Sequence, residues 1–186
     1  MVIKVIEALQ SIDRIKQILN KEGVIAIPTD TVYGLAVDGI DERAVEKLYE
    51  VKHRAGKPFT FFMLKSDLEN YAVITKRKII DFFMPGPLTV ILNKRKDASL
   101  PFMAEKIGVR IPQHNFVLHL LNAYRRPLAV SSANVTGQPT ITSPYDIIEH
   151  FTEVELVVDD GMLMSPPSTV LDLTTTPPTV MRKGTI

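Results

Sequence analysis

The sequence predicts an α/β or α+β fold, in which helices flank a twisted mixed β-sheet. Short apolar runs such as Val24–Ile27 and Leu88–Leu92 have the length and composition of buried strands. Other segments repeat their apolar residues at the spacing of one helix face, as Ile12, Ile15 and Leu19 do. Because the two kinds of segment are mixed without strict alternation, the pattern indicates a mixed sheet.

The helices are predicted from apolar spacing and from residues that start or stop a helix. Ser11 is a plausible N-cap for the first helix, and Gly23 follows it as a stop signal. Asp41 can cap the second helix, which should end near Lys52–Gly56. The others are expected at Lys76–Phe83, around Phe116–Leu121, and at Tyr145–Phe151. The expected strands are Val24–Ile27, Phe59–Leu64, Leu88–Leu92, Ile107–Ile111, Leu128–Ser131, Leu156–Val158, Thr169–Leu173 and Thr179–Met181.

The chain of 186 residues has no internal repeat and no low-complexity linker, so residues 1–186 are expected to form one domain. The absence of Cys excludes disulfides, thiolate zinc sites and cysteine nucleophiles. The four His show no metal-ligand spacing, so no metal site made by the protein is expected. Met1–Gln10 lacks a secretory hydrophobic region, and Gly23–Ala36 is too short to span a membrane. A cytoplasmic protein without a membrane partner is therefore expected.

The net charge of +1 conceals an uneven distribution along the chain. From Lys52 to Arg110 there are twelve Lys or Arg and five Asp or Glu, whereas no Lys or Arg lies between Pro127 and Met181. This distribution can be chance clustering on solvated faces. It can also form a basic cleft for an anionic ligand. Composition alone leaves both open.

The polar segment Pro28–Leu35 directly follows the strand expected at Val24–Ile27. The hydroxyls of Thr29, Thr31 and Tyr33 can project from the end of that strand, where ligands often bind in sheet proteins. The alternative is a local turn, because Thr and Asp side chains readily bond to neighbouring backbone groups. Spacing alone slightly favours the turn.

The segment Lys52–Pro58 places Lys52, Arg54 and Lys57 at the expected end of a helix. Such cations can clamp phosphate groups, since Arg offers a planar fork of donors and Lys a point charge. The alternative is that they only complement the helix dipole, which is worth roughly 0.3–1 kcal/mol each. Their position within the basic half of the sequence favours the functional interpretation.

Arg110 lies among aliphatic residues in Lys106–Pro112, a segment expected to contain a strand. If the side chain is buried, it needs an anionic partner, because an unpaired buried charge is costly. If the strand lies at the sheet edge, Arg110 can instead point to solvent. The two cases predict opposite surroundings for one side chain.

Two further polar segments follow expected strands. Ser131–Thr140 is rich in hydroxyls, amides and turn-forming residues, and such a loop can present donors to phosphate oxygens or be an ordinary polar loop. Pro167–Asp172 precedes Arg182, which a strand pair could return to the cleft or which could belong to a frayed terminus. The standard phosphate-loop, dinucleotide and zinc-protease motifs are absent from the sequence, so a nucleotide would be bound by another construction.

Taken in order, these segments resemble the YrdC family, the threonylcarbamoyl-AMP synthases. The resemblance covers roughly Ile12–Gly184 and depends on the ordered set PTDTVYGL, KxR-x-x-KP, PGPLT, VRIP, SSANxxGxP, STVLD and a late Arg-Lys-Gly. It implies a twisted sheet around a large, basic, concave cavity. It also implies a nucleotidyltransferase that makes L-threonylcarbamoyladenylate from L-threonine, bicarbonate and ATP, with release of pyrophosphate. The product would supply the tRNA threonylcarbamoyl transferase machinery that modifies an adenosine in tRNA.

The resemblance assigns roles only at matching positions. Those for L-threonine are Thr31, Arg110 and Ser168, together with the main chain near Val130. Those for ATP are Arg54, Lys57, Lys106, Ser132, Asn134, Thr140 and Arg182. Lys52 and Arg54 are the expected catalytic cations, because nucleotidyl transfer needs positioning and charge stabilisation more than covalent catalysis. Mg²⁺ is expected with the triphosphate, held mostly by phosphate oxygens and water.

Two features depart from many members of that family. Phe62 stands where they carry a His near the threonine, so packing rather than an imidazole would close that pocket. Longer relatives have a second, C-terminal domain, and this chain resembles the short single-domain form. Neither departure changes the matched segments quoted above.

Two other functions are compatible with the residues. A double-stranded RNA- or tRNA-binding module without catalysis would explain the basic segment, and it predicts an affinity that falls steeply with salt. Carbamoyl transfer, as in hydrogenase maturation proteins, is the other, but those proteins are far longer and carry Cys motifs. The absence of Cys from this chain disfavours it.

Overall fold

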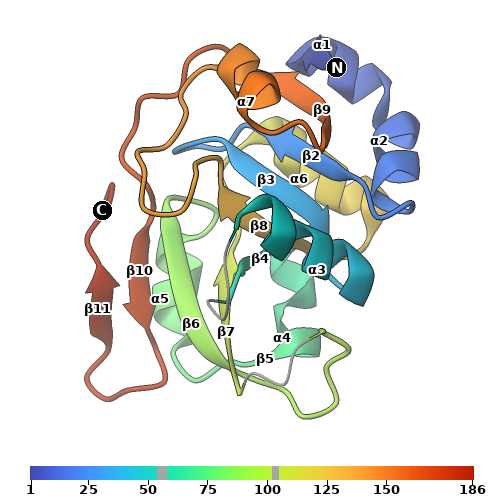
Figure 1. Ribbon diagram of the computed structural model, residues 1–186. Coiled ribbons are helices and arrows are strands. Elements are labelled where there is room, and N and C mark those ends of the chain that lie inside the picture. Colours follow the sequence, from blue (N-terminus) through green and yellow to red (C-terminus); the bar gives the residue numbers. More distant parts are fainter. Residues whose placement is uncertain (54–57, 102–104) are drawn as a thin grey trace.

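The described part of the protein contains one mixed β-sheet, as the sequence predicts. The computed structural model describes residues 1–53, 58–101 and 105–186 (Figure 1). Its strands are β1 (Val2–Lys4), β2 (Val24–Ile27), β3 (Gly34–Asp38), β4 (Thr60–Phe62), β5 (Ala72–Val73), β6 (Leu88–Lys94), β7 (Lys106–Arg110), β8 (Leu128–Ser132), β9 (Val154–Asp159), β10 (Thr169–Asp172) and β11 (Thr179–Arg182).

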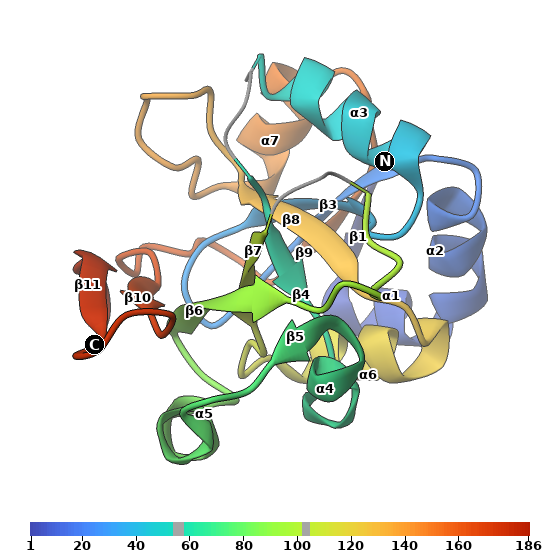
Figure 2. The same ribbon diagram turned by 90° about the horizontal axis from the view of Figure 1, so that it is seen from below.

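The order of the strands across the sheet is β1-β9-β2-β3-β8-β4-β7-β6-β10-β11, and β5 pairs with β6 outside this path. The pairs β1–β9, β9–β2, β4–β7 and β6–β10 are parallel, and the remaining pairs are antiparallel. Strands from both halves of the sequence therefore alternate within the sheet. In both views β11 lies at one margin of the molecule and α2 at the other (Figures 1 and 2).

Helices cover both faces of the sheet (Figure 2). A short 3-10 helix at Lys65–Asp67 precedes α4. Within the described residues, no helix is both long enough and apolar enough to cross a bilayer. The helices are α1 (Val5–Gln10), α2 (Ile12–Leu19), α3 (Glu42–Val51), α4 (Leu68–Tyr71), α5 (Arg77–Phe83), α6 (Asn115–Tyr124) and α7 (Pro144–His150).

The alternation of residues along β2 separates two apolar clusters. Val24 and Ala26 pack into a cluster that includes buried residues of α3 and α7. Ile25 and Ile27 point the other way, into a cluster built with α1, α2 and α6. All four residues are fully buried, which is why this strand reads as a continuous apolar run in the sequence.

The predicted helices and strands are present within a few residues of their expected bounds, and β2 has the predicted bounds. The apolar pattern does not reveal β1, α1, β3, α4 or β5.

Ser11 lies at the start of α2, but its side chain makes no capping hydrogen bond. Gly34 is the first residue of β3, where a Cβ would lie 2.6 Å from Val130 Cγ1. The glycine is needed there for the close approach of β3 and β8.

The N-cap of α3 provides a test of the local folding argument. The Asp41 carboxylate accepts a hydrogen bond of 3.0 Å from the Ala44 backbone N–H. Asp41→Ala removes this acceptor, so we expect the free energy of unfolding to fall by about 1 kcal/mol. Urea denaturation measures the change, and Glu46→Ala, on the exposed face of the same helix, is the control. Equal stability of the two variants would contradict the capping role.

Candidate functional site

A cavity of about 440 Å³ lies on one face of the sheet. Residues of every strand on the path from β3 to β11 line it. Lys106, Arg110 and Arg182 are the cations among its described lining residues, and Asp172 is the carboxylate. The cavity is therefore concave and basic, as the resemblance implies.

The floor of the cavity consists of residues that are neighbours across the sheet. Thr60 pairs with Val130 on one side and with Gly108 on the other. Ile91 pairs with Gly108 and with Asp172. A Cβ at Gly108 would make an ordinary contact of 3.7 Å with Thr60 Oγ1, so sterics do not require this glycine. Its effect is to leave open space above the middle of the sheet.

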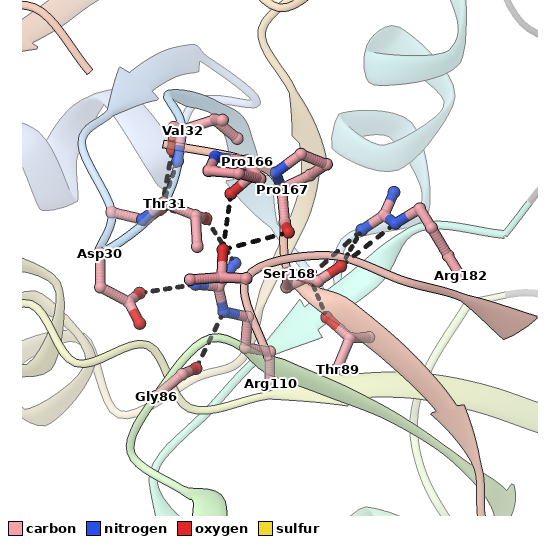
Figure 3. A network of polar contacts seen from close by, with 12 residues as sticks. Asp30, Thr31, Val32, Gly86, Thr89, Arg110, Pro166, Pro167, Ser168 and Arg182 are labelled. Carbon is pink, nitrogen blue, oxygen red and sulfur yellow. Dashed lines mark hydrogen bonds and ion pairs between the residues drawn. The ribbon is translucent and has the colours of Figure 1, made fainter. Parts of the chain in front are cut away.

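Arg110 is buried at the end of β7, with 4% of its surface exposed. Its Nη2 donates to Asp30 Oδ1 at 2.6 Å, its Nη1 to Thr31 Oγ1 at 3.0 Å, and its Nε to the Gly86 carbonyl at 3.2 Å (Figure 3). The prediction that a buried Arg110 needs an anionic partner is confirmed, and the solvent-facing alternative is wrong. β7 lies between β4 and β6, so it is not an edge strand.

The segment after β2 was predicted either to form a local turn or to project its hydroxyls toward a ligand. Thr29 and Thr31 differ in this respect. The Thr29 hydroxyl donates to the Val32 carbonyl at 2.7 Å and accepts from the backbone N–H groups of Thr31 and Val32. This is the local turn that the sequence offered as the alternative. Thr31 faces Arg110 instead, and the turn orients it.

Tyr33 holds another loop. It is fully buried, its hydroxyl donates to the Gly161 carbonyl at 2.7 Å, and it accepts from the Asp160 N–H at 3.0 Å. Burial raises the pKa of Tyr33 to about 12. The hydroxyl is therefore a neutral structural group that joins the loop after β2 to the loop after β9.

Ser168 and Arg182 meet at the edge of the cavity (Figure 3). Arg182 donates from Nε and Nη2 to the Ser168 carbonyl at 3.1 and 2.8 Å, and from Nη2 to Ser168 Oγ at 3.2 Å. Ser168 Oγ also lies 2.9 Å from Thr89 Oγ1. The pairing of β10 with β11 returns Arg182 to the cleft, so the frayed-terminus alternative is wrong.

The two guanidinium groups differ in their charge balance. Burial lowers the pKa of Arg110, while the charge and hydrogen bond of Asp30 raise it and the charge of Arg182 lowers it. Partial burial lowers the pKa of Arg182. Among the described residues Arg182 forms no ion pair with a carboxylate, whereas Arg110 does. An anion bound between the two guanidinium groups would offset the desolvation cost of burial and their mutual repulsion, both of which disfavour the charged forms.

Lys52, at the end of α3, has only 2% of its surface exposed. Its Nζ donates to the Ser132 carbonyl at 2.6 Å, to Asn134 Oδ1 at 3.1 Å and to the Asn134 carbonyl. Ser132 Oγ donates to Asn134 Oδ1 at 2.6 Å, and the Thr136 hydroxyl donates to the Lys52 carbonyl at 2.9 Å. The structure thus brings Lys52, Ser132 and Asn134 together, with the ammonium of Lys52 supporting the loop after β8.

Lys106 reaches across β6 to Asp172 on β10, where Nζ and Oδ2 are 3.3 Å apart. Asp172 Oδ1 accepts from the backbone N–H and the hydroxyl of Thr174. Both carboxylate oxygens are therefore occupied. The Lys106 side chain is half exposed, so it can move to another anion in the cavity.

The remaining predicted positions are placed as follows. Val130 and Ser132 line the cavity, whereas Thr140 lies in the loop after β8 and is not a lining residue. Arg54 and Lys57 lie outside the described residues, so their assignment stays a prediction.

Asp30, Gly86, Thr89 and Asp172 contact predicted site residues but are not themselves predicted. Asp30 stands between Thr29 and Thr31 in the motif PTDTVYGL. Its acidic side chain, in a motif expected to border a basic cleft, was the feature of the sequence that could have identified it as the partner of Arg110. The pairing of Thr89 with Ser168 and of Asp172 with Lys106 depends on strand order, which the sequence pattern does not give.

Phe62 forms an apolar wall next to Arg110. The two residues are opposite each other in the β4–β7 pair, and the Arg110 guanidinium carbon lies 5.8 Å from the centre of the Phe62 ring. Phe62 is buried, and it packs in the cluster that contains α6. Phe62 thus presents an aromatic ring, and no hydrogen-bonding group, to the cavity beside Arg110, while the closure of a threonine pocket by packing stays a prediction.

Comparison with known proteins gives relatives along most of the chain. Residues 17–184 match the Sua5/YciO/YrdC family, which is described as "Telomere recombination". A threonylcarbamoyl-AMP synthase of Pyrococcus abyssi is 35% identical over 88% of this chain and 51% of its own length. A putative threonylcarbamoyl-AMP synthase of Methanocaldococcus jannaschii is 35% identical over 98% of this chain and 87% of its own length.

A solved structure shares the fold and holds an amino acid. The P. abyssi Sua5 structure complexed with L-threonine matches with a TM-score of 0.87 and 32% identity, over 95% of this chain and 54% of the other. The chain thus spans about half the length of the P. abyssi relative and most of the M. jannaschii one. The predicted sheet fold is confirmed by this match.

The buried Arg110–Asp30 pair leads to a stability prediction. Arg110→Ala leaves the Asp30 carboxylate buried without its cation, so we expect the free energy of unfolding to fall by about 3–5 kcal/mol. Arg95→Ala breaks an exposed pair with Asp97, which solvent and salt screen, and should lower the stability far less.

Urea denaturation of both variants, of Asp30→Asn and of the double variant Asp30→Asn/Arg110→Ala provides the measurement. Removing the carboxylate charge should recover part of the loss caused by Arg110→Ala. Strictly additive losses would show that the two side chains do not interact energetically.

Proposed function

The chain belongs to the Sua5/YciO/YrdC family, and from this membership we propose that it synthesises L-threonylcarbamoyladenylate from L-threonine, bicarbonate and ATP. The single observation that carries the proposal is the buried Arg110 beside Thr31, in a basic cavity that also contains Ser168. A guanidinium in this setting suits one small carboxylate. The L-threonine complex of the P. abyssi relative supports the same choice of ligand.

Arg110 retains the donors that a substrate carboxylate needs. A guanidinium has five N–H groups, one on Nε and two on each terminal nitrogen. The contacts with Gly86, Thr31 and Asp30 use one N–H on each of the three nitrogens. No further contact with a described residue uses the second N–H of either terminal nitrogen, and the proposal assigns these two donors to the oxygens of L-threonine. Thr31, Ser168 and the main chain near Val130 complete this amino-acid subsite in the proposal.

The second subsite takes ATP. Arg182 supplies a positive charge that no described carboxylate neutralises, and Lys106 supplies one that can leave Asp172. Ser132, Asn134 and Thr140 would contact the nucleotide from the loop that Lys52 supports. The proposal adds Arg54 and Lys57 as further phosphate contacts, on the resemblance alone. Mg²⁺ enters with the triphosphate as part of the substrate, held mostly by phosphate oxygens and water.

The reaction proceeds in two steps that the cavity can organise. The amine of L-threonine combines with bicarbonate, releases water and forms a carbamate. A carbamate oxygen then attacks the α-phosphorus of ATP, and the bond to the β-phosphate breaks to release pyrophosphate. The contribution of the protein is to hold both reactants together and to stabilise negative charge. We place the product in tRNA threonylcarbamoylation in the cytoplasm, delivered to a downstream tRNA transferase.

An assay of the purified protein tests the proposed reaction. Pyrophosphate should appear only when ATP, bicarbonate and L-threonine are all present, because the attacking oxygen belongs to the carbamate. Release that ignores L-threonine would overturn the assignment. RNA binding that falls steeply with salt, without any turnover, would favour the RNA-binding module instead.

The phosphate-binding role of Arg54 can be tested separately. Arg54→Ala removes a cation from the triphosphate, so we expect turnover to fall by about tenfold or more, the range of one strong electrostatic contact. Steady-state pyrophosphate release measures this. Lys78→Ala, an exposed cation outside the quoted motifs, is the matched control and should keep the unmodified rate. An unchanged rate in Arg54→Ala would remove this residue from the site.

A further inference from the structure

We propose that residues 184–186, together with a bulge in β11, form a clamp that positions Ser168 and Arg182 relative to each other. The clamp touches neither proposed substrate directly; it acts through the two residues that do. The inference deepens the proposed function, on which the roles of Ser168 and Arg182 depend. The clamp consists of contacts among backbone groups and of hydrogen bonds from two threonine hydroxyls to backbone groups.

The bulge decides which side chain of β11 faces the cavity. Asp172 pairs with Thr179 and Leu171 with Val180, but Val170 then pairs with Arg182 rather than with Met181. One extra residue in β11 therefore shifts the register at this point. Val170 lines the cavity, so its partner Arg182 lies on the cavity side. In a regular ladder Met181 would occupy that place.

Thr169 fixes the chain immediately after the bulge. Its hydroxyl accepts from the backbone N–H groups of Gly184 at 3.0 Å and Ile186 at 3.2 Å, and it donates to the Ile186 carbonyl at 2.8 Å. Thr169 is 7% exposed and directly follows Ser168. One buried hydroxyl thus ties residues 184–186 to the segment that carries Ser168.

Thr185 and Gly184 complete the contact on the other side of Ser168. The Thr185 N–H donates to the Pro167 carbonyl at 3.1 Å, and its hydroxyl donates to the Pro166 carbonyl at 2.8 Å. A Cβ on Gly184 would lie 2.1 Å from the Pro167 carbonyl oxygen and 2.6 Å from the Thr169 nitrogen. Backbone atoms cannot move aside cheaply, so the approach requires glycine.

The clamp and the Arg182 side chain hold the same short segment. Arg182 binds the Ser168 carbonyl (Figure 3). Residues 184–186 bind Pro166, Pro167 and Thr169, on either side of Ser168. Displacement of the clamp would therefore move the proposed threonine contact and the proposed ATP contact together. A change confined to one subsite would not have this effect.

Substitution of Thr169 tests this coupling. Thr169→Val keeps the shape of the side chain and removes its three hydrogen bonds. We expect the KM of both L-threonine and ATP to rise at least about fivefold, because a misplaced contact group weakens binding. Thr169→Ser retains the hydroxyl and should restore both values. Thr179→Val, at an exposed position of β11, should change neither.

Gly184→Ala should raise both KM values as well, and thermal melting shows whether each variant is folded at the assay temperature. A KM that rises for one substrate only, or for neither, in folded Thr169→Val would overturn the proposal. Failure of Thr169→Ser to restore both values would also overturn it, because the hydroxyl would then not be the active group.

Amide hydrogen exchange of the substrate-free protein tests the clamp independently of the reaction. The N–H groups of Gly184, Thr185 and Ile186 should exchange slowly, and those of Gly184 and Ile186 should exchange at least about tenfold faster in Thr169→Val. Exchange at the rate of an unstructured peptide in the unmodified protein would overturn the clamp. If that protein releases no threonine-dependent pyrophosphate, the proposed function fails, and exchange alone then decides whether the clamp exists.

Discussion

The burial of one guanidinium group is the constraint on which the arrangement of the site depends. Arg110 lies on an interior strand, out of contact with bulk water, so each of its nitrogens needs an acceptor from the protein or from a ligand. Its acceptors come from the loop after β2 and from the turn before β6. These segments are distant in sequence, and the sheet has to bring them together around the end of β7. The cavity and the three hydrogen bonds of the guanidinium are two results of the same arrangement.

Charge at the site is divided between a compensated and an uncompensated cation. Asp30 balances Arg110, so this pair contributes hydrogen-bond geometry more than net charge. Arg182 contributes the charge, since its described partners are neutral oxygens of Ser168. Specific recognition and long-range attraction of anions are therefore supplied by different residues. This division also explains why the near-neutral net charge of the whole chain says little about the site.

Much of the fold could be predicted from the sequence because buried strands and amphipathic helices leave clear apolar patterns. Val24–Ile27 is an example, since both of its faces are buried. β3 was not predicted because it starts at a glycine within a polar motif. That glycine is needed because Val130, on another strand, lies close to it. The short β5, two residues long, is too small to leave a pattern. Strand order could not be predicted, because pairing is decided by contacts between distant segments.

The membership of a residue in the site was predictable where the residue lies in one of the sequence motifs. Its role was less predictable where that role depends on the direction in which the side chain points. The motifs identify Arg110, Ser168 and Arg182, which the structure places around one cavity. They do not show that Lys52 turns its ammonium to backbone carbonyls. Nor do they show the partners that position these residues, such as Asp30 and Thr89, because an ion pair or a hydroxyl contact between strands requires the topology. The sequence motifs thus identify which residues belong to the site, but they do not identify what each residue does there.

The strand order also determines when the site can form as the chain is synthesised. β2, made early, has β9 as its parallel neighbour, and β6 has β10. The segment with Arg110 is therefore complete long before Ser168 and Arg182 leave the ribosome. Such non-local pairing slows folding and exposes unpaired strand edges to other chains in the meantime. A chain that lacks the residues from Ser168 onward therefore lacks Ser168, Val170, Asp172 and Arg182 of the cavity lining, so the complete site requires the last two strands.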